Sequence, residues 1–347
     1  MIAFRHTRSA LLALLLLPSV LAAAAQDTSD SPNLPAYRST VSEVRVTFFA
    51  TDETNRALAS LSKADFAVVD SERVVRNFRS LTHSNETSLD VVALVDMSAS
   101  VAPRLRAAVS DVLQLVAQEQ SIPDDNVSVL SFGGTFGKTP DAATGGTLGG
   151  LRPAILCSSG CRAADALSKL TTMKSGAATP LFDALIFAAD FIAQHRSAGG
   201  RSVGRDSERG NVRPVLILFS DGYDTISLHS AGEALQAVLD EGALLYSVDM
   251  GKVDNQSSSQ APGTIFLRRV SEATGGRYFS FSSRLPQPDS AAAVLQAVLE
   301  DLRASYIVTY DLPSHQPGFH SLRLLPTHNL NLTFHSRNGY DYEPGVR

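Results

Sequence analysis

The sequence predicts an α/β fold in which a doubly wound, mostly parallel sheet is covered by helices on both faces, with a smaller β domain from the two ends of the chain. Between Asp90 and Leu302, apolar runs of strand length alternate with segments whose apolar residues recur at helical spacing. This alternation is typical of a largely parallel sheet. Before and after this region the pattern is that of strands alone.

The strands of the predicted sheet are short apolar runs, as expected for strands buried on both faces. We expect them at Asp90–Asp96, Val127–Phe132, Val215–Phe219, Leu244–Val248 and Arg277–Phe281. Apolar residues three and four apart indicate helices between the strands. These helices are expected around Leu105–Val116, Leu181–Ile192, Ala231–Leu239, Ile265–Ala273 and Val294–Leu302.

Both flanks of this region predict further strands. They are Val44–Phe48, Phe66–Val69 and Val74–Phe78 on one side, and Tyr306–Tyr310, Ser321–Leu325 and Leu330–Phe334 on the other. Because an isolated pair of strands is only marginally stable in water, we expect the two flanks to meet in one small β domain. That domain would be discontinuous, with residues 39–84 and 304–347 enclosing an α/β domain of residues 88–303.

The first 25 residues have the pattern of a secretory signal peptide. Arg5 and Arg8 precede the apolar run Leu11–Leu21, and the small residues 22–25 follow it. The run is shorter than the ~20 residues that a membrane-spanning helix needs, and no later segment is long enough. Residues 26–38 are rich in Ser, Asp and Pro and are expected to be a flexible leader. We therefore expect an exported protein, periplasmic or secreted, with no membrane span after cleavage; an uncleaved N-terminal anchor is the alternative.

The charge of the chain argues against nucleic acid or an anionic membrane as the main partner. The formal net charge is −5 without long runs of one sign, whereas both partners call for basic surface.

Only two cysteines occur, Cys157 and Cys161, in the run CSSGC. In an oxidising compartment two thiols this close can form a small-loop disulfide, although a free pair is the alternative. Two cysteines are too few for a structural zinc site, which takes four ligands.

Oxygen-bearing side chains stand where the strands of the predicted sheet end. The first strand ends in Asp96, Ser98 and Ser100, with Met97 and Ala99 between them, and the strand Val215–Phe219 is followed by Ser220 and Asp221. Thr179 comes just before the helix that starts at Leu181. In a doubly wound sheet these loops can converge beyond the carboxyl ends of the strands. Two carboxylates and three hydroxyls are the hard ligands that Mg²⁺ prefers. Since few of these ligands are charged, the ion would stay electrophilic and attract an acidic group of a partner.

These motifs resemble the metal-ion-dependent adhesion site of the von Willebrand factor type A domain family. The resemblance covers about residues 88–303 and rests on DMSAS, Thr-Pro and FSDG at the expected places. It implies a six-stranded sheet with one antiparallel edge strand, which we expect between Gly145 and Ile155. It also implies one Mg²⁺ or Mn²⁺ ion that binds an exposed Asp or Glu of a protein partner. The implied metal site is made of Asp96, Ser98, Ser100, Thr179 and Asp221.

The flanks are similar to those of a bacterial family of exported proteins related to von Willebrand factor type A. The residues that carry this resemblance are Leu61–Phe66, Phe319–His320 and Asn338–Tyr340. That family usually has a Gly in the turn near Asn55 and Arg56, and this chain does not. The departure concerns a surface turn and leaves the predicted metal site unchanged.

The sequence lacks the motifs of three enzyme classes that also place polar residues at the ends of strands. Phosphatases of the haloacid dehalogenase type place a second Asp two residues after the first, where this chain has Ser98, so the general acid is missing. Neither Ser98 nor Ser220 lies in a G-x-S-x-G elbow, and no G-x-G-x-x-G follows the first strand. We therefore expect that the protein is not an enzyme, and a metal-dependent hydrolase is the less favoured alternative. A structural protein whose metal only stabilises loops remains the main alternative.

Single residues of the site also have a simpler interpretation. Ser98 alone could cap the following helix in an ordinary polar loop, and only the five residues together point to a metal site. Tyr223 and Asp224 follow Asp221 in the same loop, where they could contact the partner or be plain loop residues.

Overall fold

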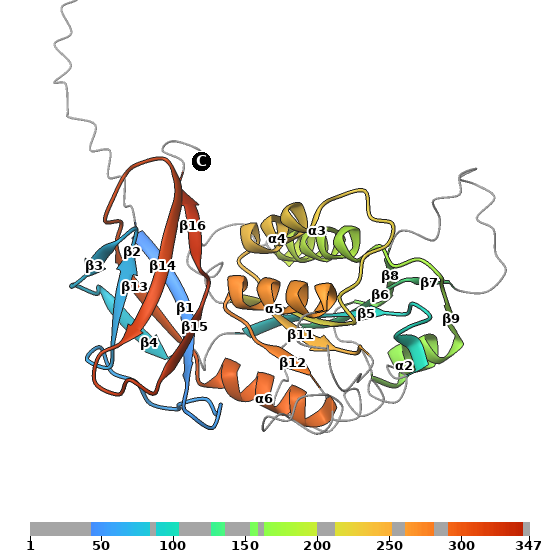
Figure 1. Cartoon of the computed structure of the whole chain (residues 1–347), viewed down its shortest axis with the longest axis horizontal. Coiled ribbons are helices and arrows are strands. Elements are labelled where there is room, and N and C mark those ends of the chain that lie inside the picture. The colour runs from blue at the N-terminus through green and yellow to red at the C-terminus, as the bar shows by residue number, and fades with distance from the viewer. Residues whose placement is uncertain are drawn as a thin grey trace, which may run out of the picture. The chain divides into compact units, whose positions relative to one another are not determined.

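A computed structural model describes residues 43–83, 88–103, 126–135, 153–158, 163–199, 212–251, 261–280 and 291–342 (Figure 1). The predicted signal peptide and leader, the helix expected at Leu105–Val116 and Cys161 lie outside the described residues.

The central sheet has six strands in the order β12-β11-β10-β5-β6-β8. Its neighbours are parallel except for β8, which runs antiparallel to β6. The predicted doubly wound sheet with one antiparallel edge strand is therefore confirmed. The edge strand overlaps only the last two residues of the range expected for it. The strands are β5 (Ser88–Asp96), β6 (Asn126–Phe132), β8 (Ala154–Cys157), β10 (Val212–Ser220), β11 (Leu244–Asp249) and β12 (Tyr278–Ser280).

Helices cover both faces of this sheet (Figure 1). On one face α3 (Leu181–Gly199), α4 (Ala231–Asp240) and α5 (Pro262–Thr274) share a buried apolar cluster with the strands. On the other face α2 (Ala163–Thr172) and α6 (Ala291–Arg303) share a second cluster. The helix α2 was not predicted, whereas the other four helices were.

Helix ends follow local sequence signals. Ser230 and Glu233 form a capping box at the start of α4. The helix α5 begins with Pro262 and ends before Gly275, whose φ of 87° is the left-handed value typical of a glycine after a helix.

The two flanks form two antiparallel four-stranded sheets, each with strands from both ends of the chain. One sheet has the order β15-β1-β13-β4 and the other β16-β14-β2-β3. This confirms that the flanks meet, while the exact domain boundaries stay a prediction. The strands are β1 (Glu43–Thr51), β2 (Phe66–Asp70), β3 (Arg73–Val75), β4 (Ser80–His83), β13 (Tyr306–Asp311), β14 (Gly318–Pro326), β15 (Thr333–Ser336) and β16 (Gly339–Tyr342).

A single apolar cluster joins the two flanking sheets. Phe48 and Tyr310 of one sheet pack with Phe66 and Leu322 of the other. The carboxylate of Asp70, which is fully buried, accepts hydrogen bonds from the hydroxyls of Tyr310 (2.8 Å) and Tyr340 (2.7 Å). Asp70 Oδ2 is thus bonded to a strand of each sheet, and Asp70 Oδ1 lies 3.6 Å from Nδ1 of the buried His320.

Several strand predictions in the flanks were imprecise. The strands β4 and β16 were not predicted as separate strands, and β3 is shorter than the expected Val74–Phe78. The last C-terminal strand predicted as Leu330–Phe334 is shifted to Thr333–Ser336. In the turn where the related bacterial family usually has Gly, Asn55 has a φ of 65°. Asn is one of the few residues other than Gly that tolerate this left-handed conformation, so the turn is kept.

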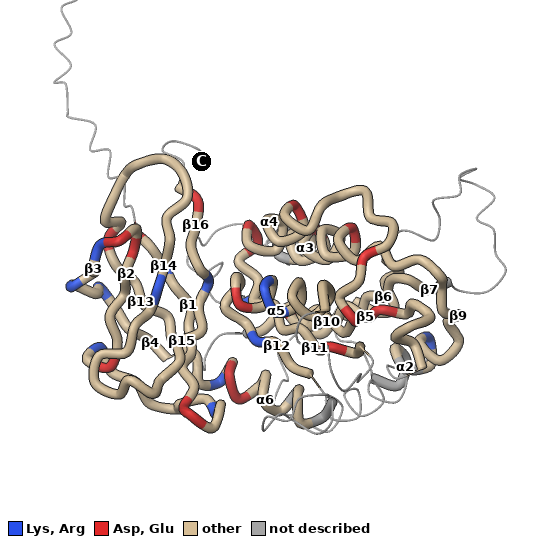
Figure 2. The backbone as a smooth tube through the Cα atoms, in the orientation of Figure 1, with Lys and Arg blue, Asp and Glu red and all other residues tan. Residues whose placement is uncertain are grey.

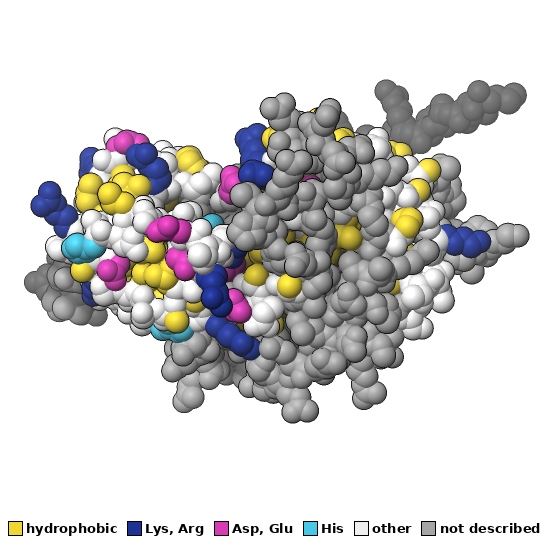
Figure 3. All heavy atoms as spheres, turned by 60° about the horizontal axis from the view of Figure 1, so that its bottom comes forward, with side chains coloured by type: hydrophobic (Ala, Val, Ile, Leu, Met, Phe, Trp, Pro, Cys, Tyr) yellow, Lys and Arg dark blue, Asp and Glu magenta, His cyan; other side chains and the backbone are white. Residues whose placement is uncertain are grey.

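Charged residues of both signs occur in the flanking sheets and on the helices around the central sheet (Figure 2). On the face drawn in Figure 3, described side chains of both signs are interspersed. Among the described residues, no helix is long and apolar enough to cross a membrane.

The pH dependence of stability should depend on His335. Its ring stacks on Phe49 with centroids 4.6 Å apart and hydrogen-bonds Thr51 at 3.1 Å. Burial, with the nearby Arg277 charge, lowers the pKa of His335 to about 4 from 6.5. The unfolded chain therefore takes up this proton first as the pH falls, and stability is lost between pH 6.5 and 4.

We expect the wild type to lose roughly 2 kcal/mol more than His335→Phe between pH 7 and 4.5 in urea unfolding. The control is His328→Phe, at an exposed position. This variant should lose as much unfolding free energy as the wild type over the same pH range. Equal losses for the wild type and His335→Phe would contradict the assignment.

Candidate functional site

The carboxyl ends of the two central strands meet at Asp96. Val95 of β5 lies opposite Phe219 of β10, so the next residues, Asp96 and Ser220, are neighbours at the same edge of the sheet. Asp96 is fully buried, and its Oδ2 accepts a hydrogen bond from Ser220 Oγ (2.8 Å). Its Oδ1 accepts one from the backbone N–H of Ser98 (2.8 Å), which bends the chain sharply after the strand.

A chain of oxygens leads from this bend to the loop after β10. The hydroxyls of Ser98 and Ser100 are 3.2 Å apart, and Ser100 Oγ donates to Asp221 Oδ2 at 2.7 Å. Ser98 is buried and Ser100 is exposed, so the chain runs from the interior to the surface. Ser100 therefore lies within hydrogen-bond distance of two other predicted ligands, Ser98 and Asp221.

The loop after β6 closes the site from a third side. The carbonyl of Gly133 accepts from Gly176 N–H (2.7 Å), and the carbonyl of Gly176 accepts from Ala99 N–H (2.9 Å). Gly133 has a φ of 69°, and a Cβ there would lie 3.0 Å from Ser98 N and 3.2 Å from Asp96 Oδ1. Beside it, the short strands β7 (Gly134–Thr135) and β9 (Lys174–Ser175) pair antiparallel. A residue larger than Gly would crowd the Asp96 carboxylate.

Thr179 is buried at the start of α3 and is held through its backbone. Its N–H donates to the hydroxyl of Thr225 (2.8 Å), and its carbonyl accepts from Thr225 N–H (3.0 Å). The preceding carbonyl, of Ala178, is 3.4 Å from the Cβ position of Gly133. Thr179 thus adjoins the same junction, while the described hydrogen bonds connect the other four residues directly.

Burial raises the pKa of the Asp96 carboxyl to about 6, and the nearby Asp221 charge adds to this, although the hydrogen bonds from Ser98 and Ser220 act against it. Both of these hydrogen-bond donors are uncharged, so they stabilise the negative charge of Asp96 as dipoles and not as counter-charges. A cation beside these oxygens would favour the ionised form. Hydroxyl and carboxylate oxygens are also the donors that Mg²⁺ and Mn²⁺ accept. The residues present therefore fit the predicted cation.

Two residues that support the site were not predicted from the sequence. Ser220 fixes Asp96, and Thr225 fixes Thr179, yet neither was singled out. Ser220 could have been found because it is the last residue of β10, directly before Asp221. Among the described residues no group of three His, Cys, Asp or Glu could hold a metal ion, and at this site three of the five predicted ligands are hydroxyls.

The two predicted partner contacts differ in accessibility. Tyr223 is 46% exposed beside Asp221. The carboxylate of Asp224 accepts hydrogen bonds from the N–H of Phe182 (3.3 Å) and of Ser227 (3.2 Å), so it is already used within the chain. Cys157 is the last residue of β8, and its pairing with Cys161 stays a prediction.

The profile of the von Willebrand factor type A domain matches residues 90–263. Similar solved structures include the manganese-loaded TRAP protein of Plasmodium vivax, with 15% identity over 79% of this chain and 98% of that chain and a TM-score of 0.40. Proximal thread matrix protein 1 of the mussel byssus has 12% identity and a TM-score of 0.39 over 63% of this chain. The match spans about half of the mussel protein, 49%. Human COPII-coat protein Sec24c has 9% identity and a TM-score of 0.39, over 73% of this chain and 44% of that chain. No curated protein sequence matches.

The backbone around Asp221 depends on a contact between two glycines. A Cβ on Gly263, the second residue of α5, would lie 2.2 Å from the carbonyl oxygen of Asp221. Gly263→Ala must therefore push the loop away, and we expect it to lower the free energy of unfolding by roughly 1–3 kcal/mol.

Gly232 provides a matched control, because it is the second residue of α4 and a Cβ there has its nearest neighbour at 3.8 Å. Gly232→Ala should be neutral or stabilise by up to about 1 kcal/mol in the same urea titration. Similar stabilities for the two variants would show that the loop yields without cost.

Proposed function

Because the chain belongs to the von Willebrand factor type A domain family, we propose that it is an exported protein-binding module. In this proposal one divalent cation, Mg²⁺ or Mn²⁺, is held by Asp96, Ser98, Ser100, Thr179 and Asp221. The cation supplies an electrophilic point at the surface that attracts an Asp or Glu side chain of a partner protein.

The observation that carries the proposal is the run of oxygens from Ser98 through Ser100 to Asp221 at the mouth of the site. Hydroxyl ligands carry no charge, so they neutralise the cation less than carboxylates would. The remaining positive charge attracts an anionic group, and the exposure of Ser100 lets a side chain from outside approach. A buried cation surrounded by carboxylates would serve structure instead.

We propose no catalytic role for this site. Asp96 is buried and both of its oxygens accept hydrogen bonds from the chain itself. Two residues later, where a phosphatase of the haloacid dehalogenase type has its general acid, Ser98 stands. Export is proposed from the pattern of residues 1–25 alone.

Calorimetric titration of residues 26–347 with Mg²⁺ and with Mn²⁺ tests the cation. We expect saturable binding to one site in the wild type. Ser100→Ala and Asp221→Asn should weaken it at least about tenfold, since each removes a donor oxygen. Both residues lie at least partly at the surface, so the variants should fold.

The control is Asp341→Asn, at an exposed acidic position of β16 that is far in the sequence from all five predicted ligands. Its affinity should equal that of the wild type. If the wild type binds neither ion, or if Asp341→Asn loses as much affinity as Asp221→Asn, the proposed cation site is wrong.

A further inference from the structure

The loop that follows Asp221 exposes apolar side chains. Tyr223 is 46% exposed, Ile226 44% and Leu228 81%. Three large apolar side chains are thus exposed within six positions of one loop. We refer to residues 221–229 as the rim loop.

The rim loop is held in this conformation by the first turn of α3. Ser227 Oγ accepts hydrogen bonds from the N–H groups of Phe182 and Asp183, both at 3.1 Å. Asp183 in turn accepts from the N–H groups of Leu228 (3.0 Å) and His229 (3.1 Å) and from the His229 ring (2.8 Å). The start of a helix leaves such N–H groups without intrahelical partners, and the rim loop satisfies them. These bonds fix the backbone so that Leu228 points outward.

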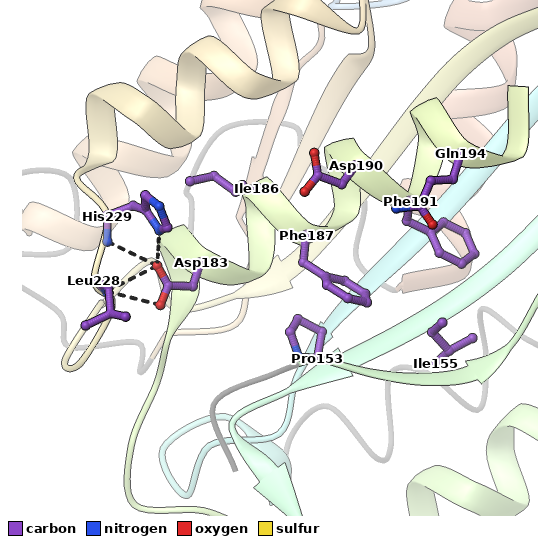
Figure 4. A pocket seen from close by; sticks show the side chains of 10 residues that line it. All are labelled: Pro153, Ile155, Asp183, Ile186, Phe187, Asp190, Phe191, Gln194, Leu228 and His229. Atoms are coloured by element: carbon purple, nitrogen blue, oxygen red, sulfur yellow. Dashed lines mark hydrogen bonds and ion pairs between the residues drawn. The ribbon is translucent and has the colours of Figure 1, made fainter. Parts of the chain in front are cut away.

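A groove of about 500 Å³ begins where the rim loop ends (Figure 4). One wall is a face of α3, where the partly buried Ile186 and Phe187 and the exposed Asp190 line the groove at helical spacing. The opposite wall is Ile155 of β8, which is 50% exposed. Leu228 and His229 form the end nearest to the start of α3.

The dimensions of the groove suit an extended chain. From Asp183 to Gln194 the helix wall rises ~16 Å at 1.5 Å per residue. An extended segment covers this distance with about five residues. Within the described sheet β8 is the edge strand, and the edge of a sheet is a place where an extended partner can add its backbone.

The charges of the groove select the partner. Among the described residues that line the groove, Asp183 and Asp190 are acidic and none is Lys or Arg. Asp183 is already bound to His229, whereas Asp190 is exposed on the helix. A Lys or Arg of the partner would complement Asp190.

The groove and the candidate cation site share the same two elements. The rim loop starts at Asp221 and ends at the groove, and α3 starts two residues after Thr179. One segment of a partner can therefore cover both.

From these observations we propose that the rim loop and the α3–β8 groove dock an extended segment of a partner protein. The segment carries an acidic residue for the cation, apolar side chains for Leu228 and Phe187, and a Lys or Arg for Asp190. The docking of the acidic residue rests on the proposed function, whereas the groove contacts do not.

Selection from a displayed library of random dodecapeptides on residues 26–347 with Mn²⁺ tests this surface. We expect the selected peptides to contain Asp or Glu, followed or preceded by apolar residues and one Lys or Arg. The affinity of one synthesised peptide is then measured by fluorescence anisotropy. Leu228→Ser and Asp190→Lys should each weaken it at least tenfold, and EDTA should abolish binding.

Two matched variants are the controls. Leu330 is 76% exposed in the C-terminal flank, and Asp240 is exposed on α4. Leu330→Ser and Asp240→Lys make the same two kinds of substitution at exposed positions that do not line the groove. They should change the affinity for the peptide less than twofold.

The outcomes separate the groove from the cation. Binding that needs Mn²⁺ but is indifferent to Leu228→Ser and Asp190→Lys overturns the groove and keeps the proposed function. Binding that these variants weaken but EDTA leaves intact supports the groove and overturns the cation's part. Failure to select any peptide overturns docking of a partner segment.

Discussion

The buried carboxylate of Asp96 is the interaction on which the geometry of the candidate site depends. It joins the end of β5 to the end of β10 through Ser220 and turns the chain after β5 through the N–H of Ser98. Burying a carboxylate is costly unless it receives hydrogen bonds or a counter-charge. The two bonds meet part of that cost, and they also present the hydroxyls of Ser98 and Ser100 toward Asp221. The Asp96 carboxylate, which is costly to bury, thus also positions the serine hydroxyls around it.

Close backbone contacts around Asp96 restrict the movement of the candidate site. Gly133 on one side and the Gly222–Gly263 contact on the other bring backbone within van der Waals distance of the site. These close approaches require residues without a Cβ. Because these backbone contacts are tight, they fix the positions of the candidate ligands before any ion binds. Such a site is preorganised.

The rim loop connects this site to the side of the domain. It satisfies the free N–H groups of α3, so the same hydrogen bonds that stabilise the helix start also hold apolar side chains at the surface. Elsewhere in the described chain apolar side chains of this size mostly enter one of three clusters. The cost of exposing Leu228 is consistent with a surface meant to be covered.

The sequence by itself determined the fold class and the identity of the predicted ligands. Continuous apolar runs require strands buried on both faces, and polar residues at their ends must then lie at one edge of the sheet. Short and weakly patterned elements such as β4, β16 and α2 escaped prediction because their burial depends on partners distant in the sequence. Only the tertiary structure decided that Ser220 supports Asp96, that Asp224 is used to cap α3, and that Leu228 reaches a groove formed with β8. Each of these is a contact between segments far apart in the chain, and a local pattern records the residue types but not the distance between them.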